Sequence, residues 1–256
     1  MDTVTGRWAM LETGITVIGP EDERPRPAVI LFHGCGGQRE HMTHYAEAAK
    51  AVGWRAFIID SFGPRGWSRQ RALFAVCSGM TFRGDQRAGD VLAALDGVSR
   101  RRDVDPARIA LAGWSHGGWG IMEAMSADRR AGALGLRDPG AVSLTGVLGA
   151  YLAYPYIGFG AFNRMRPWTH CPKTLAVISR TDHLSTVRNA ERVHDMVRRC
   201  GAEVETWIAD GSHAFDEPGA ARPMLYDPAL ADEALRRFAA LLEDVAIAPP
   251  LPEGAG

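Results

Sequence analysis

The chain has 256 residues, of which 46% are hydrophobic and 23% are charged. This composition supports a sizeable core and excludes a disordered or fibrous protein. The 29 basic and 30 acidic side chains nearly cancel, and the formal net charge is -1 at pH 7. Because proteins that bind nucleic acid or anionic membranes carry a basic surplus, we expect a small-molecule partner, with no nucleic acid and no membrane.

The sequence contains no candidate for a leader peptide or a membrane helix. The first thirty residues carry acidic side chains at positions 12, 21, 22 and 23 and no uninterrupted apolar run. Elsewhere, no segment approaches the roughly 18 apolar residues of a membrane-spanning helix. These features predict a cytoplasmic protein.

The four cysteines lie far apart, at Cys35, Cys77, Cys171 and Cys200. They form no CxxC pair and no paired Cys/His spacing. This argues against a zinc site and, in a chain of this length, against a disulfide framework. We therefore expect free thiols and no bound metal.

Short apolar runs that end at a Gly, Pro, polar or charged residue are typical of buried parallel strands, because helices cover both faces of such a sheet. Residues 15–18 predict an antiparallel edge strand near the start of the chain. Six further runs predict central strands at residues 28–32, 56–59, 109–112, 144–148, 175–178 and 204–208.

Helical patterns lie between the predicted strands. Gly53 follows residues 41–52 as a C-cap would, and three later segments carry apolar side chains on one face. These are Val91, Leu92, Leu95 and Val98; Val187, Ala190, Val193 and Val197; and Leu235, Phe238, Leu241 and Leu242. Alternating strands and helices predict an α/β fold with a mostly parallel, doubly wound sheet.

We expect one α/β domain over residues 1–248 and a disordered Pro-rich tail at residues 249–256. Two irregular stretches interrupt the pattern, residues 61–84 and the aromatic-rich residues 151–172. Both are candidates for the rim of a pocket. The alternative is that they only cap the sheet.

The strongest functional motif lies at residues 109–118. A predicted strand leads into Gly-Trp-Ser-His-Gly at residues 113–117, and an apolar helical pattern follows. This is typical of a nucleophile elbow, in which a serine occupies a strained turn between a strand and a helix and flanking glycines leave room for the chain. The motif predicts Ser115 as a nucleophile at the carboxyl end of the sheet.

A serine nucleophile needs a base within hydrogen-bond reach and an acid that orients the base. On such a sheet the chain order is Ser, then Asp or Glu, then His. The last two predicted strands are followed by Asp182 and His213, which would reach the same edge as Ser115. We predict His213 as the general base and Asp182 as the acid. Asp210 and Asp216 are alternatives for the acid because they flank the histidine.

A glycine-rich loop, His-Gly-Cys-Gly-Gly, follows the first central strand at residues 33–37. Its backbone can approach a bound carbonyl oxygen closely. The N–H groups of Cys35 and His116 are therefore predicted to form an oxyanion hole, and the Cys35 thiol is expected to take no part. A phosphate-binding loop is disfavoured because neither GxxxxGK[ST] nor GxGxxG spacing is present.

Other histidines and tryptophans have no predicted catalytic role. The His116 ring is expected to pack or face solvent, and His33 to anchor its loop by a hydrogen bond. His183 and the pair His41 and His44 lack the further ligands that a metal site requires. Trp114 and Trp119 flank the elbow, where they line the acyl pocket or pack in the core.

Together these motifs resemble the dienelactone hydrolase family of α/β hydrolases, in its serine-bearing branch. The resemblance covers nearly the whole chain, through residues 28–37, 56–66 and 104–118 and the loops of Asp182 and His213. It implies the α/β-hydrolase fold in one compact domain without a large lid. It also implies an enzyme that acts on esters or lactones without a cofactor.

Founding members of this family use a cysteine nucleophile, where this sequence has Ser115, and bind a substrate carboxylate with arginines. Arg65 and Arg83 lie in loops that could supply such an arginine. The resemblance thus implies carboxylic ester hydrolysis more directly than dienelactone hydrolysis itself.

The alternative on the same fold is a peptidase or an acyltransferase, although peptidases of this fold commonly carry an additional access-restricting domain. A non-catalytic binding protein or a cysteine-based redox protein is disfavoured by the complete triad set and the lack of a resolving-cysteine motif.

Overall fold

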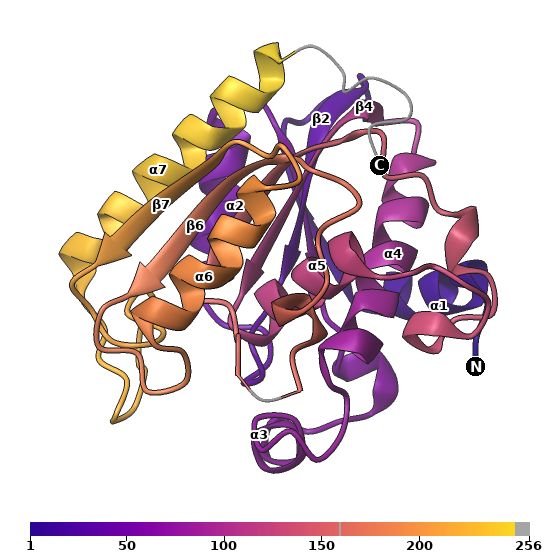
Figure 1. Ribbon diagram of the computed structural model, residues 1–256. Coiled ribbons are helices and arrows are strands. Elements are labelled where there is room, and N and C mark those ends of the chain that lie inside the picture. Colours follow the sequence, from indigo (N-terminus) through magenta and orange to yellow (C-terminus); the bar gives the residue numbers. More distant parts are fainter. Residues whose placement is uncertain (159, 249–256) are drawn as a thin grey trace.

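A single mostly parallel sheet organises the computed structural model, which describes residues 1–158 and 160–248 (Figure 1). Within these residues the sheet has seven strands in the order β1-β3-β2-β4-β5-β6-β7. Strand β1 pairs antiparallel with β3, and the other neighbours pair parallel. The strands are β1 (Ile15–Ile18), β2 (Arg26–Phe32), β3 (Arg55–Ile59), β4 (Val104–Trp114), β5 (Val147–Ala153), β6 (Lys173–Ser179) and β7 (Val204–Ala209).

Helices cover both faces of the sheet. They are α1 (Val4–Leu11), α2 (His41–Ala51), α3 (Arg69–Ala75), α4 (Gly84–Ser99), α5 (His116–Ser126), α6 (Val187–Arg198) and α7 (Pro228–Ile247). Helices α1, α4, α5 and α6 lie on one face, whereas α2 and α7 lie on the other (Figure 1). Along β2, Ile30 joins the first apolar cluster while Val29 and Leu31 join the second. This alternation confirms the predicted doubly wound α/β architecture.

Most predicted elements coincide with observed ones. The edge strand at residues 15–18 is β1, and the helical apolar faces lie on α4, α6 and α7. Gly53 has a φ of 85° and its N–H donates to the carbonyl of Lys50, as the predicted C-cap requires. The prediction of disorder concerns residues 249–256, which lie outside the described residues.

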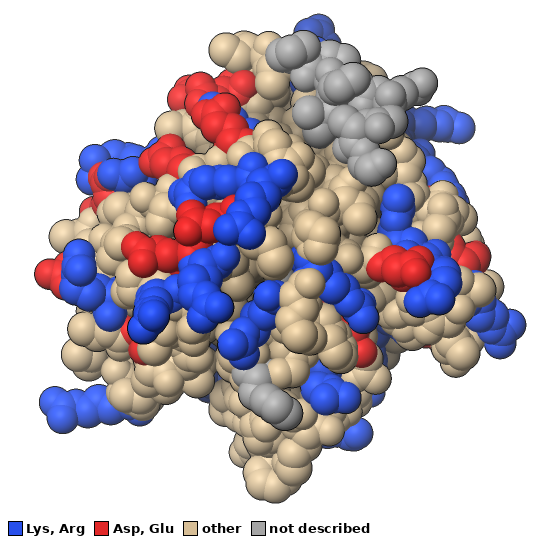
Figure 2. Space-filling view, in the orientation of Figure 1, with Lys and Arg blue, Asp and Glu red and all other residues tan. Residues whose placement is uncertain are grey.

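Figure 2 shows acidic and basic side chains mixed over the upper left of one face, as expected for a net charge near zero.

The prediction for the fifth strand was wrong in its bounds. Strand β5 begins at Val147, whose N–H donates to the carbonyl of Leu144 in a turn, and it continues to Ala153. Tyr151 therefore belongs to the sheet, not to a pocket rim, and its hydroxyl lies 3.1 Å from that of Tyr45 in the core. An aromatic strand residue resembles a loop residue locally, because only packing against a distant helix shows that it is buried.

Two helices were not predicted. Helix α3 forms within the stretch 61–84 that was expected to be irregular, and α1 precedes the first strand. Helix α1 begins after Thr3, whose side chain accepts the N–H of Gly6 as an N-cap. Its Trp8 ring packs where Gly97 of α4 has no side chain, since a Cβ there would lie 2.0 Å from the ring. The short length of both helices weakens their periodic signal.

The prediction of free thiols was wrong. Cys35 is bonded to Cys77 and Cys171 to Cys200, and no free cysteine is present among the described residues. The partners are 42 and 29 residues apart, so sequence spacing alone does not reveal that the fold brings them together. By the chain-entropy relation each bond stabilises the fold by about 4 kcal/mol.

No helix in the described residues is long and apolar enough to cross a membrane. The cytoplasmic location stays a prediction, and disulfides are more typical of oxidising compartments.

A buried histidine on α6 makes the stability depend on pH. His194 is 1% exposed, and burial, with Arg198 nearby, lowers its pKa to about 4. In the unfolded chain its pKa is about 6.5, so the unfolded state binds more protons between these values. Stability is therefore lost as the pH falls through this window. Acidification from pH 7 to pH 5 should reduce the free energy of unfolding by about 2 kcal/mol through His194 alone.

Urea unfolding of the unmodified protein and of His194→Leu at both pH values measures this contribution. Neither ring nitrogen of His194 has a hydrogen-bond partner within the described residues, so leucine removes the titration without breaking a hydrogen bond. We expect the variant to lose less stability on acidification than the unmodified protein. An identical loss in both proteins would contradict the interpretation.

Candidate active site

Ser115 occupies a strained turn between β4 and α5. Its φ of 49° and ψ of -108° lie in a region that residues with side chains rarely adopt. The glycines on either side make this turn possible. A Cβ on Gly113 would lie 2.6 Å from the backbone of Gly117, and a Cβ on Gly117 would lie 2.0 Å from the carbonyl oxygen of Phe32. The geometry is that of the predicted nucleophile elbow.

His213, in the loop after β7, bridges the serine and an acid. Its Nε2 lies 2.9 Å from the Ser115 Oγ, and its Nδ1 lies 2.8 Å from the Asp182 Oδ2. The side chains of His213 and Asp182 are only 5% and 2% exposed. Because the carboxylate accepts the proton on Nδ1, Nε2 is left to accept the serine proton. The fold thus brings the three predicted triad residues together, with His213 within hydrogen-bond distance of both Ser115 and Asp182.

Asp182 is held in place by its own loop. Its second oxygen accepts the N–H of Leu184 at 2.7 Å and that of Ser185 at 3.2 Å. Asp210, an alternative for the acid, has an 81% exposed side chain and pairs with Arg180 at 3.2 Å. Only Asp182 of these two can orient the imidazole.

Asp216, the other alternative, supports the histidine indirectly. Its buried carboxylate accepts hydrogen bonds from Tyr45 at 2.7 Å, from Trp114 at 3.1 Å and from the hydroxyl of Tyr154. Burial, and then the charge of Asp216, raises the pKa of Tyr154, so this hydroxyl stays protonated. The Tyr154 ring packs edge-on against His213, with ring centroids 4.7 Å apart. Sequence analysis missed this support, since no local motif links Tyr154 to the histidine loop.

The glycine-rich loop after β2 passes close to the nucleophile. A Cβ on Gly34 would lie 3.6 Å from the Cβ of Ser115, and both Cys35 and His116 line the same pocket as the serine. Among the described residues, the backbone N–H groups of Cys35 and His116 have no acceptor. Donors without a partner at the wall of a pocket are suited to a ligand oxygen.

The rings of His33 and His116 hold the loops and are not available as bases. His33 accepts the N–H of Ser61 at Nε2, at 3.2 Å, and therefore donates from Nδ1 to the carbonyl of Gly34 at 2.7 Å. The predicted anchoring role of His33 is present. Nε2 of His116 lies 2.7 Å from the carbonyl oxygen of Phe82, and burial, with Arg87 nearby, lowers the His116 pKa to about 3. Both rings are neutral near pH 7.

The pocket beside Ser115 encloses about 190 Å³. Five of its eleven lining residues come from the stretch 61–84, which therefore forms part of the rim, and Trp119 also lines it. Trp114, by contrast, is 1% exposed and packs in the core. The lining residues are Cys35, Val76, Cys77, Ser78, Gly79, Arg83, Ser115, His116, Trp119, Tyr156 and Leu184.

The two arginines singled out from the sequence differ in their surroundings. Arg65 donates to both oxygens of the buried Asp90, at 2.9 and 2.7 Å, and is held away from the pocket. Arg83 lines the pocket and makes no ion pair among the described residues. Within residues 1–158 and 160–248, no cluster of three or more His, Cys, Asp or Glu side chains could hold a metal.

The class of α/β hydrolases is defined by a strained serine between a strand and a helix of a doubly wound sheet, hydrogen-bonded to a histidine that is in turn hydrogen-bonded to an aspartate. The family model described as the dienelactone hydrolase family matches residues 14–135. The resemblance noted in the sequence is thereby confirmed.

Solved structures with a similar fold include a dienelactone hydrolase-like enzyme and an esterase. A dienelactone hydrolase-like promiscuous phosphotriesterase from metagenomic libraries has 17% identity and a TM-score of 0.69, with 90% of this chain and 92% of that chain covered. A thermophilic esterase of Thermogutta terrifontis with bound propionate has 16% identity and a TM-score of 0.67, with 93% and 91% covered. At such identities these likenesses show the fold.

A curated relative matches a shorter stretch. Acylamino-acid-releasing enzyme 1 of Oryza sativa subsp. japonica is 28% identical over 102 residues, which are 39% of this chain. The match spans only 12% of that relative's own length.

Proposed function

We propose that the chain is a serine hydrolase that cleaves small carboxylic esters or lactones through an acyl-enzyme on Ser115. The observation that carries this proposal is the continuous chain of contacts from the Ser115 Oγ through His213 to Asp182, at the wall of a pocket. The match to the dienelactone hydrolase family supports ester hydrolysis as the reaction class.

In the proposed reaction, His213 accepts the proton of the Ser115 hydroxyl while the oxygen attacks the ester carbonyl. The N–H groups of Cys35 and His116 stabilise the resulting oxyanion, aided by the positive end of the α5 dipole. His213 then donates its proton to the leaving alcohol, and water hydrolyses the acyl-enzyme by the same steps. Asp182 stays ionised and stabilises the imidazolium. No step requires a cofactor.

The pocket supports a short acyl group. Its roughly 190 Å³ are bounded by Trp119 and Tyr156, whose bulk limits chain length. The esterase of Thermogutta terrifontis was solved with propionate and with butyrate, which supports short acyl chains by analogy. Arg83, which lines the same pocket, further favours substrates that carry a carboxylate near the ester.

A series of p-nitrophenyl esters tests the function and the acyl preference together. We expect kcat/KM for the acetate and butyrate esters to exceed that for the octanoate ester by at least about tenfold, because added methylenes exceed the pocket. Trp119→Ala should narrow this ratio by enlarging the pocket. Trp207→Ala, which removes a large aromatic side chain from β7 outside the pocket, should leave the ratio unchanged. Absence of turnover with every ester would refute the proposed function, and equal turnover of all lengths would refute the acyl preference.

A second candidate is a peptidase that uses the same three residues. It is favoured by the match to a relative whose name describes the release of acylamino acids. Turnover of N-acetylalanine p-nitroanilide, compared with that of the p-nitrophenyl esters, distinguishes the two. A kcat/KM for the anilide comparable to that for the butyrate ester would make the peptidase the better assignment.

A further inference from the structure

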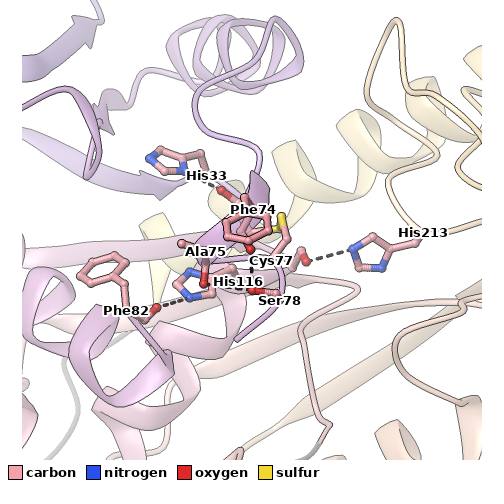
Figure 3. The surroundings of a disulfide bond; sticks show 11 residues. His33, Phe74, Ala75, Cys77, Ser78, Phe82, His116 and His213 are labelled. Atoms are coloured by element: carbon pink, nitrogen blue, oxygen red, sulfur yellow. Dashed lines mark hydrogen bonds between the residues drawn. A yellow bond between two sulfur atoms is a disulfide. The ribbon is translucent and has the colours of Figure 1, made fainter. Parts of the chain in front are cut away.

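A disulfide forms part of the pocket wall. Cys35 and Cys77, whose Cα atoms are 5.2 Å apart, both line the cavity that contains Ser115. Figure 3 shows this bond's surroundings, with His116 on one side and His213 on the other. The bond joins the loop after β2 to the turn after α3, although these segments are 42 residues apart in the chain.

The segment attached through Cys77, residues 63–83, is called the cap because its later part lines one wall of the pocket. Its buried side chains form, together with Phe62, a small cluster that is separate from the two clusters on the sheet faces, and Cys35 packs against it. Leu73, Phe74 and Met80 of the cap are 44%, 74% and 61% exposed. The lobe at the bottom of Figure 2, which contains α3, is largely uncharged at its tip. With so little burial, the position of the cap depends on its attachments.

Those attachments lie at the two ends of the cap and at Cys77. Near the start, Arg65 pairs with Asp90 at 2.7 Å. At the end, the carbonyl oxygen of Phe82 lies 2.7 Å from the His116 ring nitrogen. Between them, within the described part of the chain, the hydrogen bonds of residues 67–81 stay inside the segment 62–81. The bond at Cys77 is therefore the covalent link between the middle of the cap and the loop of Cys35, and it adds to the packing of the small cluster.

The other end of the disulfide lies in a loop with little side-chain support. In residues 34–37 every position except Cys35 is glycine. Gly37 has a φ of 84°, and its N–H donates to the carbonyl of Gly34 at 3.2 Å. Glycines leave such a turn many conformations. The His33 ring holds the start of this loop through the Gly34 carbonyl, and within residues 34–37 the Cys35 side chain is the one that can hold the position of the proposed oxyanion donor.

From these contacts we infer that the Cys35–Cys77 disulfide positions the active site, so that its reduction by a dithiol lowers ester turnover reversibly. The inference rests on the proposed function. Cys77 acts here as a positioning residue, since it reaches the reaction only through Cys35 and the cap. Intact, the bond holds the Cys35 N–H beside Ser115 and the cap at the pocket wall.

The redox step is an ordinary thiol–disulfide exchange. One thiolate of the dithiol attacks a sulfur of the bond and forms a mixed disulfide, and its second thiol then displaces the protein sulfur. Cys35 and Cys77 become thiols, and the dithiol becomes a cyclic disulfide. Two electrons and two protons pass from reductant to protein.

The second disulfide supplies a matched control. Cys171 precedes β6, and Cys200 lies between α6 and β7. This bond is therefore at the amino ends of the strands, whereas Ser115 follows the carboxyl end of β4. Because the two bonds close loops of similar length, their loss should reduce overall stability to a similar degree. Cys77→Ser and Cys200→Ser therefore differ mainly in distance from the pocket.

The experiment compares these variants with the unmodified protein using p-nitrophenyl butyrate. We expect Cys77→Ser to lower kcat/KM by about tenfold to a hundredfold, mainly through kcat, because one oxyanion donor contributes up to about 10²–10³. Cys200→Ser should stay within about twofold. Dithiothreitol should lower the activity of the unmodified protein to that of Cys77→Ser and have little effect on that variant. Reoxidation after removal of the dithiothreitol should restore the activity of the unmodified protein.

Circular dichroism and thiol alkylation mapped by mass spectrometry accompany the kinetics. Free thiols at Cys35 and Cys77 in the oxidised protein would overturn the inference, as would equal losses in both variants. If Cys77→Ser does not fold, the titration of the unmodified protein with dithiothreitol gives the same decision. A fluorophosphonate separates the two proposals: no labelling of the unmodified protein refutes the proposed function, whereas equal labelling rates with and without the bond refute only the inference.

Discussion

Replacing Ser115 by alanine should lower the turnover of an activated ester by about three to six orders of magnitude while the fold stays intact. The hydroxyl lies 2.9 Å from the His213 Nε2 and is the atom that would form the acyl-enzyme. Loss of a triad nucleophile elsewhere leaves only the weaker catalysis of the oxyanion hole and binding. Alanine also keeps the backbone N–H groups that line the pocket, so the loss reports on the hydroxyl.

Steady-state kinetics on p-nitrophenyl butyrate measure this loss, and circular dichroism verifies the fold. Ser61→Ala is a suitable control because Ser61 is buried near the site and its hydroxyl has no partner within the described residues. We expect this control to stay within a few-fold of the unmodified protein. A fluorophosphonate should form one adduct, on Ser115. A loss smaller than about a hundredfold in Ser115→Ala would remove Ser115 as the nucleophile.

Asp182→Asn should reduce turnover by roughly four orders of magnitude, as the same change does in other triads. The asparagine oxygen can keep the hydrogen bonds from the N–H groups of Leu184 and Ser185, which turns the amide NH₂ toward His213. The imidazole Nδ1 must then accept a hydrogen bond from this amide, so the single ring proton lies on Nε2. In that tautomer His213 cannot accept from Ser115.

Asp210→Asn and Asp216→Asn provide the comparison for this prediction. Asp210 is exposed and pairs only with Arg180 in the described structure, so its replacement should cost less than about twofold. Asp216→Asn should weaken the support of His213 through Tyr154 and cost more than Asp210→Asn, yet far less than Asp182→Asn. If Asp210→Asn proves the most damaging of the three, the assignment of the acid is wrong.

The fold class and the candidate triad were accessible from the sequence because they rest on short-range patterns. Apolar runs identified the buried strands, and the spacing of Gly113 and Gly117 around Ser115 identified the turn that only small flanking residues permit. The chain order of serine, aspartate and histidine then placed all three at one edge of the sheet. The first two signals span a few residues each, and the third needs only the order of residues along the chain, so none of them requires knowledge of distant contacts.

Other features depend on segments that are far apart in the chain. Asp182, Asp210 and Asp216 are equivalent in composition, and their roles differ because of the partners that the fold gives them. The burial of Tyr151 on β5 follows from its contact with Tyr45, 106 residues away. The two disulfides likewise join loops whose proximity results from sheet order and helix packing. Pairwise contacts across such separations leave no periodic trace in one sequence, because they are specified by how the layers pack and not by local conformational preference.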